Sequence, residues 1–354
     1  MRVGYYAHHH GRGHVSRAAA VLRHVRVPAA LFTSAPAPDV PPGVRLVPLP
    51  PDAPRSAADT APAPPFHYAP TGHAGLRQRM ARIAAWAAEG PGVLVVDVSC
   101  EVAVFGRLLS LPVVVARQHG ARWDWAHRTA YGLAERLLAP FPASLEEPDA
   151  PDWVRAKTVY AGGFSRFDGR AVPPPPVERR VAVVGGGGGG GPGSGRAWRA
   201  EDVAAAARTT PDWRWTLLGA EADVSAPENL EAVGWTDDPF PHLTAASVVI
   251  TTAGHNGTME AAAVGRPLIV IPEERPFEEQ RRKAAALDRV GAALVRGAWP
   301  APEAWPALLE EARRTDPGPL RALVDGGGAR RAAALLDALA ETASGEAFGT
   351  ADAA

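Results

Sequence analysis

Residues 251–272 read Thr251-Thr-Ala-Gly-His-Asn-Gly-Thr-Met-Glu260 and Ala261-Ala-Ala-Val-Gly-Arg-Pro-Leu-Ile-Val-Ile-Pro272. Apolar runs at 247–250 and 268–271 predict buried strands on either side of a glycine-bearing turn and a helix. The first N–H groups of such a helix are unpaired and carry its positive end, so they suit a phosphate or diphosphate. We expect Glu260 in the first helical turn, where its carboxylate can accept two hydrogen bonds from a ribose diol. The stretch therefore predicts a nucleotide-sugar site in an α/β sheet.

Length and composition narrow the class of protein. A length of 354 residues favours two domains, and a hydrophobic content of 46% is ample for buried cores. The formal net charge of −1 argues against nucleic-acid binding, and no apolar run approaches the length of a membrane span. The lone Cys100 excludes an internal disulfide, and the first residues lack a signal-peptide pattern. We expect a soluble, cytoplasmic protein that binds no nucleic acid.

Strand-like and helix-like segments alternate along the whole chain, which favours parallel α/β sheets. The stiff run Pro173-Pro-Pro-Pro176 predicts a domain boundary near residue 175. The sequence thus divides into an N-terminal Rossmann-like domain (1–175), a C-terminal Rossmann-like domain (176–328), a helix that could cross back to the first domain (329–343) and a tail expected to be disordered (344–354).

Two loops of the second half carry further signals of a nucleotide site. The glycine run after Gly185 follows a predicted strand, and Gly186 and Gly187 allow a phosphate to approach the backbone. No Gly-Lys-Ser/Thr follows, which disfavours a P-loop ATPase, and a low-complexity turn is the alternative. Trp235 follows Gly234, where an aromatic ring can flank a flat base; ordinary packing in the core is the alternative.

Candidate catalytic residues lie where strands of the first half end. His14 lies between the first predicted strand and the first helix, and open α/β sheets bind ligands at the carboxyl ends of their strands. His14 is the candidate general base, with a structural histidine as the alternative. Asp97 ends an apolar strand and could orient that imidazole or cap the next helix. The three histidines at 8–10 are expected to point to alternating sides without completing a ligand set, so no metal site is predicted.

Other loops of the first half are expected to shape an acceptor pocket. The proline-rich span 36–70 holds little regular structure, which is typical of functional or mobile loops. Arg117, Arg122 and Arg128 favour an anionic or phosphate-bearing acceptor, with a solvated loop as the alternative for the stretch 117–122. The candidate acceptor-side residues are Gly13, Tyr68, His73, Arg117, His119 and Arg122.

The segment Pro272-Glu-Glu-Arg-Pro-Phe-Glu-Glu-Gln280 follows the second buried strand. Carboxylate and amide groups at a strand end can bind sugar hydroxyls through paired hydrogen bonds. The alternative is an ordinary charged helix start.

Together these motifs resemble the inverting, nucleotide-sugar-dependent glycosyltransferases of GT-B fold. The spacing from Glu260 to Gly265-Arg-Pro267 and Gln280 is similar to the donor signature of the UDP-glycosyltransferases. The loop before Gln280 has the longer length found in the peptidoglycan N-acetylglucosaminyltransferase that acts on lipid-linked muramyl pentapeptide. Gly234-Trp235 lies upstream at nearly the family's distance, and Gly11-Arg-Gly-His14 resembles the family's first glycine loop. The resemblance implies two Rossmann-like domains that face each other across a cleft.

The resemblance also implies roles for single residues. His14 would activate the acceptor with support from Asp97, and Trp235 would lie against the base. Thr252 replaces a phosphate-binding histidine of the plant enzymes, and Glu279 replaces an aspartate that selects the sugar. The implied donor-binding residues, with the glycine run included, are Gly186, Gly187, Trp235, Thr252, Gly254, His255, Asn256, Gly257, Thr258, Glu260, Glu279 and Gln280.

The sequence therefore predicts an inverting, metal-independent glycosyltransferase that uses no cofactor. Its co-substrate would be a nucleotide diphosphate sugar, with UDP favoured and dTDP as the alternative, and its acceptor a small or lipid-linked hydroxyl compound. Membrane contact would be at most peripheral, and the oligomeric state is not specified. A GT-B nucleotide-sugar 2-epimerase is the main alternative, followed by a nicotinamide-dependent oxidoreductase and a non-catalytic nucleotide-sugar-binding protein.

Overall fold

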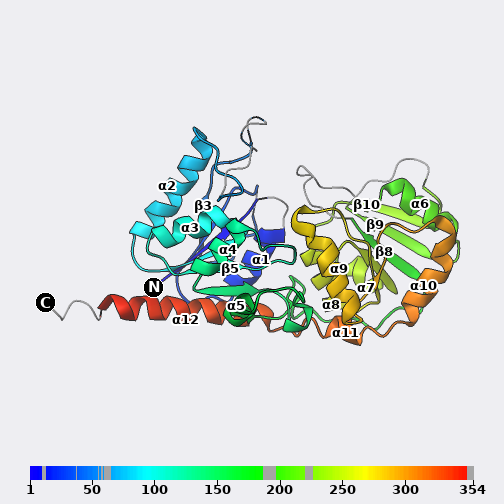
Figure 1. Ribbon diagram of the computed structural model, residues 1–354. Helices are drawn as coiled ribbons and strands as arrows, with labels where there is room; N and C mark the ends of the chain where they lie inside the picture. Colours follow the sequence, from blue (N-terminus) through cyan, green and yellow to red (C-terminus); the bar gives the residue numbers. More distant parts are fainter. Residues whose placement is uncertain are drawn as a thin grey trace.

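Two parallel sheets, each covered by helices, make up the computed structural model (Figure 1). The N-terminal sheet has seven strands in the order β3-β2-β1-β4-β5-β6-β7, and the C-terminal sheet has six in the order β10-β9-β8-β11-β12-β13. In each sheet the strand order reverses beside the first strand of the domain, β1 or β8, as it does in a Rossmann fold. The structure describes residues 1–9, 13–36, 38–54, 56, 59, 65–185, 197–219 and 226–348, so the predicted phosphate-binding Gly186 and Gly187 lie outside the described residues.

The strands of the N-terminal sheet are short and apolar because helices cover both of its faces. Every residue of β1 and β4 is buried. The strands are β1 (Val3–Ala7), β2 (Ala29–Thr33), β3 (Val44–Pro48), β4 (Val93–Asp97), β5 (Val113–Ala116), β6 (Arg136–Ala139) and β7 (Thr158–Tyr160). The helices are α1 (Gly13–Leu22), α2 (Ala74–Ala88), α3 (Cys100–Leu108), α4 (Trp125–Leu133) and α5 (Asp152–Lys157), with the 3-10 turn η2 (Ala143–Leu145).

The C-terminal sheet repeats this layered design. Its strands are β8 (Arg180–Val184), β9 (Arg214–Leu218), β10 (Leu230–Gly234), β11 (Val248–Thr251), β12 (Leu268–Val270) and β13 (Leu294–Val295). Its helices are α6 (Ala200–Arg208), α7 (Phe240–Ala245), α8 (His255–Val264), α9 (Glu279–Arg289), α10 (Trp305–Arg314) and α11 (Gly318–Arg321), with the 3-10 turns η3 (Pro276–Glu278) and η4 (Pro302–Ala304).

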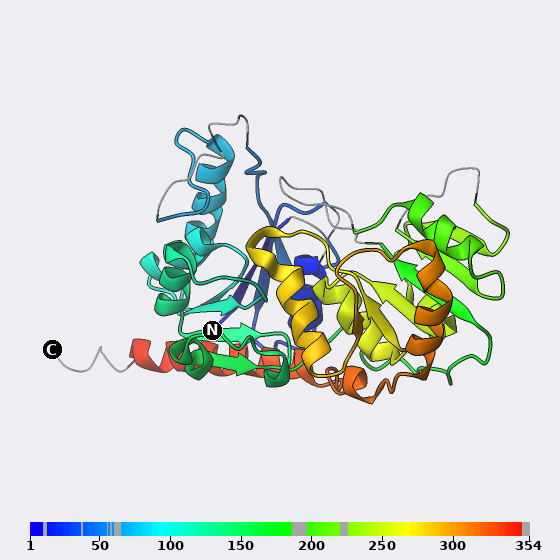
Figure 2. The same cartoon turned by 45° about the vertical axis from the view of Figure 1, so that its right-hand side comes forward.

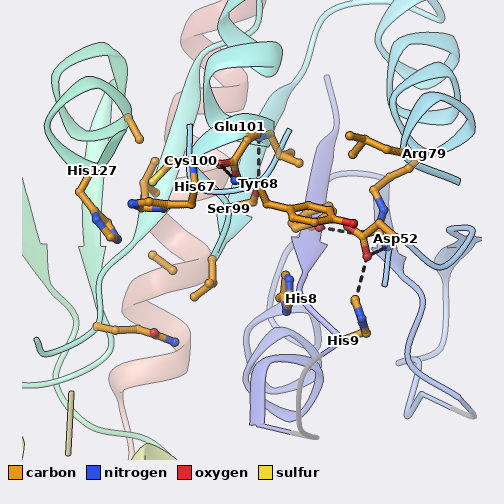
Figure 3. A pocket seen from close by; sticks show the side chains of 18 of the residues that line it. His8, His9, Asp52, His67, Tyr68, Arg79, Ser99, Cys100, Glu101 and His127 are labelled. Carbon is orange, nitrogen blue, oxygen red and sulfur yellow. Dashed lines mark hydrogen bonds and ion pairs between the residues drawn. The ribbon is translucent and has the colours of Figure 1, made fainter. Parts of the chain in front are cut away.

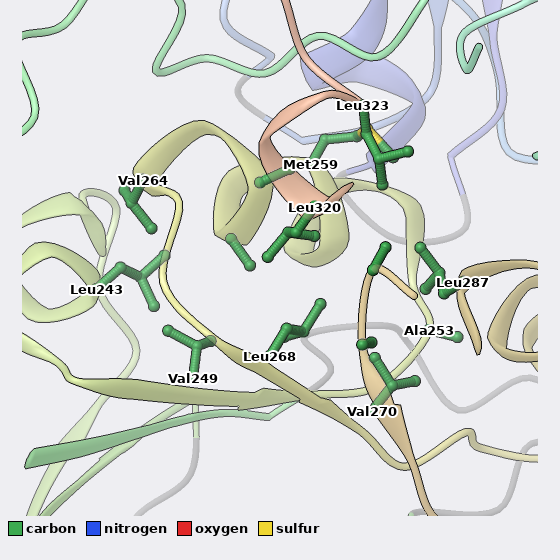
Figure 4. Close-up of a cluster of buried hydrophobic side chains, with 14 of the residues drawn as sticks. Leu243, Val249, Ala253, Met259, Val264, Leu268, Val270, Leu287, Leu320 and Leu323 are labelled. Carbon is green, nitrogen blue, oxygen red and sulfur yellow. The ribbon is translucent and has the colours of Figure 1, made fainter. Parts of the chain in front are cut away.

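Helix α8 is held inside the C-terminal domain by one hydrophobic cluster. Figure 4 shows Met259 and Val264 of this helix among side chains from β11, β12 and α11, including Val249, Leu268 and Leu320. Met259 is completely buried. Because interiors are close-packed, this cluster fixes the helix, and with it the position of the helix N-terminus at the end of β11.

The last helix, α12 (Gly328–Phe348), leaves the C-terminal domain and lies along the N-terminal one (Figures 1 and 2). Its residues Ala332 and Leu336 belong to the cluster that contains Val3 and Val93 of the N-terminal sheet. The buried carboxylate of Asp337 accepts hydrogen bonds from Arg26 N at 3.0 Å and Arg26 Nε at 3.1 Å. The chain thus connects the two domains twice. In the described part of the chain, no helix combines the length and apolarity needed to cross a membrane.

Candidate functional site

A histidine–aspartate pair lies at the carboxyl end of the N-terminal sheet. In the register of β1 with β4, Ala7 pairs with Asp97, so both strands end at the same level. Helix α1 begins at Gly13, and the Nδ1 atom of His14 lies 2.9 Å from Oδ1 of Asp97. The aspartate side chain is completely buried, whereas the His14 ring keeps 16% of its surface exposed. The buried Asp97 carboxylate therefore orients the imidazole, and the rest of the ring is accessible from the cleft.

Asp97 is an ionised anchor and does not cap a helix. Arg17 donates from Nε to Oδ2 of Asp97 at 2.8 Å and from Nη2 to Oδ1 at 2.6 Å. Burial alone would raise the pKa of Asp97, but the charges of Arg17 and His14 lower it well below its usual range. Ser99 caps α3 instead, because its hydroxyl accepts a hydrogen bond from Val102 N at 3.1 Å. Two roles were predicted for Asp97, orienting the His14 imidazole or capping the next helix. The orienting role agrees with this geometry.

The turn after β11 has the shape of an anion site at a helix end. Gly254 is the N-cap of α8, and the helix begins at His255. Glu260 therefore lies in the second turn, and its expected placement in the first turn is wrong. Thr258 is also corrected, because it is completely buried and both its N–H and its hydroxyl donate to the Gly254 carbonyl. Thr252 is buried, and its hydroxyl accepts a hydrogen bond from Gly254 N at 3.3 Å.

The start of α8 faces the start of α1 across the two domains. The Asn256 side chain donates to the Gly13 carbonyl at 3.4 Å, and a Cβ placed on Gly13 would lie 3.6 Å from Asn256 Nδ2. A small cleft here is lined by residues of both domains, among them Arg17 and His255. The residue pair His14–Asp97 and the helix end at 254–257 thus belong to one site, although a long stretch of chain separates them.

Glu260 and Trp235 lie toward the outer side of this helix end. Arg166, in the segment that links the domains, donates from Nε to Oε1 of Glu260 at 2.8 Å and from Nη1 to the Asp237 carbonyl at 2.6 Å. Burial raises the pKa of Glu260, and the Arg166 charge opposes that rise. Trp235 is 55% exposed, so it is not a core residue. Arg166 was not predicted, because the sequence around it carries no motif.

Glu279 and Gln280 are the first two residues of α9. The Glu279 carboxylate forms an ion pair with Arg122 of the N-terminal domain at 2.8 Å. Gln280 is buried, and its Oε1 accepts a hydrogen bond from Glu273 N at 2.8 Å. Its Nε2 lies 3.9 Å from the position of a Cβ on Gly254, so the amide is next to the α8 turn.

Lys283, one turn further along α9, is a second residue that the sequence analysis missed. Lys283 is buried, with a relative exposure of 2%. Its Nζ has no hydrogen-bond partner among the described residues, and the buried Nε2 of His255 has none either. Burial lowers the pKa of Lys283 to about 7. Burial and then the Lys283 charge lower the pKa of His255, the first residue of α8, well below its usual range.

A cavity of about 340 Å³ lies mostly within the N-terminal domain (Figure 3). His8 lies in its wall, with its ring centroid 6.2 Å from that of His14. Phe277 of the C-terminal domain completes the wall, and its ring lies 5.3 Å from His67 and 4.8 Å from His127. Phe277 and Glu278 both have positive φ, at 60° and 56°, which is uncommon for non-glycine residues and costly to hold.

Only part of the predicted acceptor side reaches this cavity. Tyr68 and Arg122 line it. Arg117 and His119 are buried below it, because the Arg117 guanidinium pairs with Glu146 and His119 Nε2 lies 3.1 Å from the Leu145 carbonyl. These two residues are corrected from pocket-lining to structural.

His73 and the first histidines also differ from expectation. His73 is buried and caps α2 by accepting a hydrogen bond from Leu76 N at 3.2 Å, so it too is structural. The rings of His8 and His9 do not point to opposite sides; they stack with centroids 4.7 Å apart. Strand β1 ends at Ala7, so the alternation of a strand no longer applies to them.

Comparisons with known proteins define the class. Residues 218–301, in the C-terminal half of the chain, match the glycosyltransferase family 28 C-terminal domain. A curated relative is an uncharacterized glycosyltransferase of Methanosarcina acetivorans, 36% identical over 94 residues, which are 25% of this chain and 24% of the relative. The match thus spans about a quarter of that protein's length.

Solved structures extend the likeness to the whole chain. A UDP-glucosyltransferase from Polygonum tinctorium capable of glucosylating indoxyl has a TM-score of 0.68 at 15% identity, covering 96% of this chain and 98% of the other. Acinetobacter baumannii MurG has a TM-score of 0.57 at 16% identity, covering 96% and 99%. The chain therefore has the GT-B fold, as predicted, and the resemblance to GT-B glycosyltransferases is confirmed.

Proposed function

We propose that this protein is a glycosyltransferase that moves a sugar from a nucleotide diphosphate sugar to an acceptor hydroxyl with inversion. The observation that carries the proposal is the His14–Asp97 pair at 2.9 Å, on the domain that faces the start of α8. In this mechanism His14 Nε2 takes the proton of the acceptor hydroxyl as its oxygen attacks the anomeric carbon. Asp97 fixes the ring with Nδ1–H donating, and it stabilises the imidazolium that forms.

The departing diphosphate would be stabilised by the N–H groups at the start of α8 and by the Lys283 ammonium. Both supply positive charge that is fixed before the reaction, which is the cheapest way to stabilise charge that develops in a transition state. We therefore infer a transfer that needs no divalent ion. The base would lie along Trp235, and the ribose diol would bind Glu260 beside Arg166. UDP is the favoured nucleotide, with dTDP as the alternative.

The cavity whose wall contains His8, the neighbour of His14, supports transfer over epimerisation, because a 2-epimerase needs no acceptor compartment. Its volume, about 340 Å³, is within the usual range for small-molecule pockets. Its walls are largely apolar and aromatic, with Tyr68, Val115 and Phe277 among them. We infer a small, largely apolar acceptor that carries a hydroxyl group.

An anionic acceptor is not supported by the arginines that pointed to it from sequence. The Arg117 guanidinium is paired with Glu146, and that of Arg122 with Glu279. Arg128 is exposed on α4 and does not line the cavity in the described part of the chain. The charges of the two buried arginines are thus already neutralised within the protein.

Binding of nucleotides to the ligand-free protein tests the donor site directly. UDP should raise the Tm more than GDP, because binding to the native state alone stabilises it. Glu260→Gln keeps an oxygen for Arg166 but loses the charge that binds the diol, so we expect UDP affinity to fall roughly 10-fold or more by calorimetry. Glu231→Gln, an exposed carboxylate on β10, is the matched control. Equal UDP affinities in both variants would remove Glu260 from the site.

Phe277 offers a test of the acceptor cavity. Glycine at this position relieves the positive φ while it removes the ring from the cavity wall. For Phe277→Gly we expect the acceptor KM to rise about 5- to 30-fold, from the loss of about 1–2 kcal/mol of aromatic contact, at unchanged UDP affinity. Trp125→Gly, which removes a 71% exposed ring on α4, is the control. An unchanged acceptor KM in Phe277→Gly would place the acceptor elsewhere.

A further inference from the structure

The structure gathers two histidines and the single cysteine at one end of the acceptor cavity. His67 lies in the segment before α2, Cys100 is the first residue of α3, and His127 lies in α4. One ligand atom of each residue lies within 4.8 Å of the others. Figure 3 shows His67 beside the Cys100 sulfur, with the His127 ring facing the same space. Thiolate and imidazole are the ligands that zinc prefers, and three of them suffice where a fourth position stays open.

Asp124 orients both histidines from behind. Its Oδ1 lies 2.9 Å from His67 Nε2, and its Oδ2 lies 2.5 Å from His127 Nδ1. A carboxylate oxygen accepts hydrogen bonds, so in each histidine the ring nitrogen that faces Asp124 is the one that donates. This arrangement fixes the tautomers with lone pairs on His67 Nδ1 and His127 Nε2. A carboxylate that accepts from the back of a histidine is the usual outer support of a zinc ligand.

From this arrangement we infer that His67, Cys100 and His127 form a binding site for a zinc-like divalent ion in the wall of the cavity. Ligand atoms in a tetrahedral zinc site are separated by about 3.5 Å, so the three groups must approach by roughly 1 Å. His67 is exposed and can make this movement by side-chain rotation. The thiol proton of Cys100 leaves to solvent when the ion binds. The fourth position then faces the cavity, so an ion and an acceptor would exclude each other.

Arg122 is the group that opposes this site. It donates from Nη1 to His127 Nε2 at 3.2 Å, so an ion must displace that hydrogen bond. Arg122 keeps its hydrogen bonds to Glu279 at 2.8 Å and Gln118 at 2.9 Å when it does so. Because a guanidinium repels a cation, its removal should strengthen metal binding, whereas removal of any ligand should weaken it. Opposite effects of neighbouring substitutions distinguish a metal site from general damage.

Cobalt(II) added to the full chain is the probe, because thiolate-bound Co²⁺ absorbs in the near ultraviolet. Cys100 is the only cysteine in the sequence, so a thiolate band reports this site alone. We expect the band in the wild type, its loss in Cys100→Ser, an affinity about 10–100-fold weaker in Asp124→Asn, and a tighter one in Arg122→Gln. Asparagine still caps α4, so Asp124→Asn should fold. The exposed His24→Gln is the control and should not change the titration.

Two results would overturn the inference: no thiolate band in the folded wild type, or a band that persists in Cys100→Ser. Should Cys100→Ser fail to give a native circular dichroism spectrum, His127→Gln takes its place, and an unchanged Co²⁺ affinity there has the same meaning. This readout does not use sugar transfer. The zinc site and the proposed function can therefore fail separately, although the statement about the acceptor rests on the proposed function.

Discussion

His14→Ala should lower the kcat of sugar transfer by about 10²–10⁴-fold, the usual contribution of a positioned general base. The affinity for UDP should stay unchanged, because His14 belongs to α1 and the proposed nucleotide contacts belong to the other domain. A base that acts only in the transition state affects kcat and kcat/KM alike. Single-turnover rates with calorimetric UDP affinities measure the two effects separately.

The control for this prediction is His24→Ala, an exposed histidine just beyond the end of α1. Asp97→Asn is a poorer probe of chemistry. It would leave the buried Arg17 guanidinium without its carboxylate, and a broken buried pair costs about 3–5 kcal/mol of stability. Its effect on rate would therefore mix catalysis with unfolding. Wild-type transfer by folded His14→Ala would exclude the base assignment and leave His14 as a structural neighbour of Asp97.

The parts of the site that could be predicted from the sequence are those formed by residues close together along the chain. The strand–turn–helix unit from β11 to β12 follows from two apolar runs, a glycine turn and the Gly265-Pro267 break. Gly254, Asn256, Gly257 and Thr258 were predicted at a helix start for that reason, and α8 begins at His255. Arg117 follows a strand in the same way, yet it is buried, because Glu146 approaches from a turn 29 residues further along the chain. No local pattern contains that partner.

The contacts between the two domains could not be predicted from the sequence either. Phe277 appeared as one residue of a charged helix start, and nothing in its neighbourhood predicts that its ring contacts both His67 and His127 of the other domain. The Arg122–Glu279 ion pair has the same origin. Both depend on how two separately folded sheets approach, which is set by packing across the whole interface.

Lys283→Met should change stability and nucleotide binding in opposite directions. The chain has only two lysines, Lys157 and Lys283, and the second buries an ammonium with no hydrogen-bond partner among the described residues. An unpaired buried charge is costly, so an apolar side chain of similar length should raise the Tm of the ligand-free protein. If the ammonium serves the diphosphate, UDP affinity should fall about 10- to 100-fold, as for a lost charged hydrogen bond.

The pH dependence of wild-type stability tests the sign of the Lys283 contribution independently. Burial lowers the pKa of Lys283 from 10.5 to about 7, so between these values the unfolded chain binds a proton that the folded chain lacks. This residue therefore makes stability rise with pH across that window, and the contribution disappears in Lys283→Met. If the ammonium binds the diphosphate, UDP should bind with proton uptake near pH 8, measured by calorimetry in buffers of different ionisation enthalpy.

Lys157→Met is the matched control. Lys157 lies in the N-terminal domain, where its ammonium donates to the backbone carbonyls of Tyr131 and Gly132. Its loss should leave UDP affinity and proton uptake unchanged. A purely structural Lys283 would give the reverse pattern for its own variant, with a lower Tm and wild-type UDP affinity. Lys283 is one of two lysines in a chain that otherwise uses arginine, and a diphosphate bound beside its ammonium would offset the cost of burying that charge.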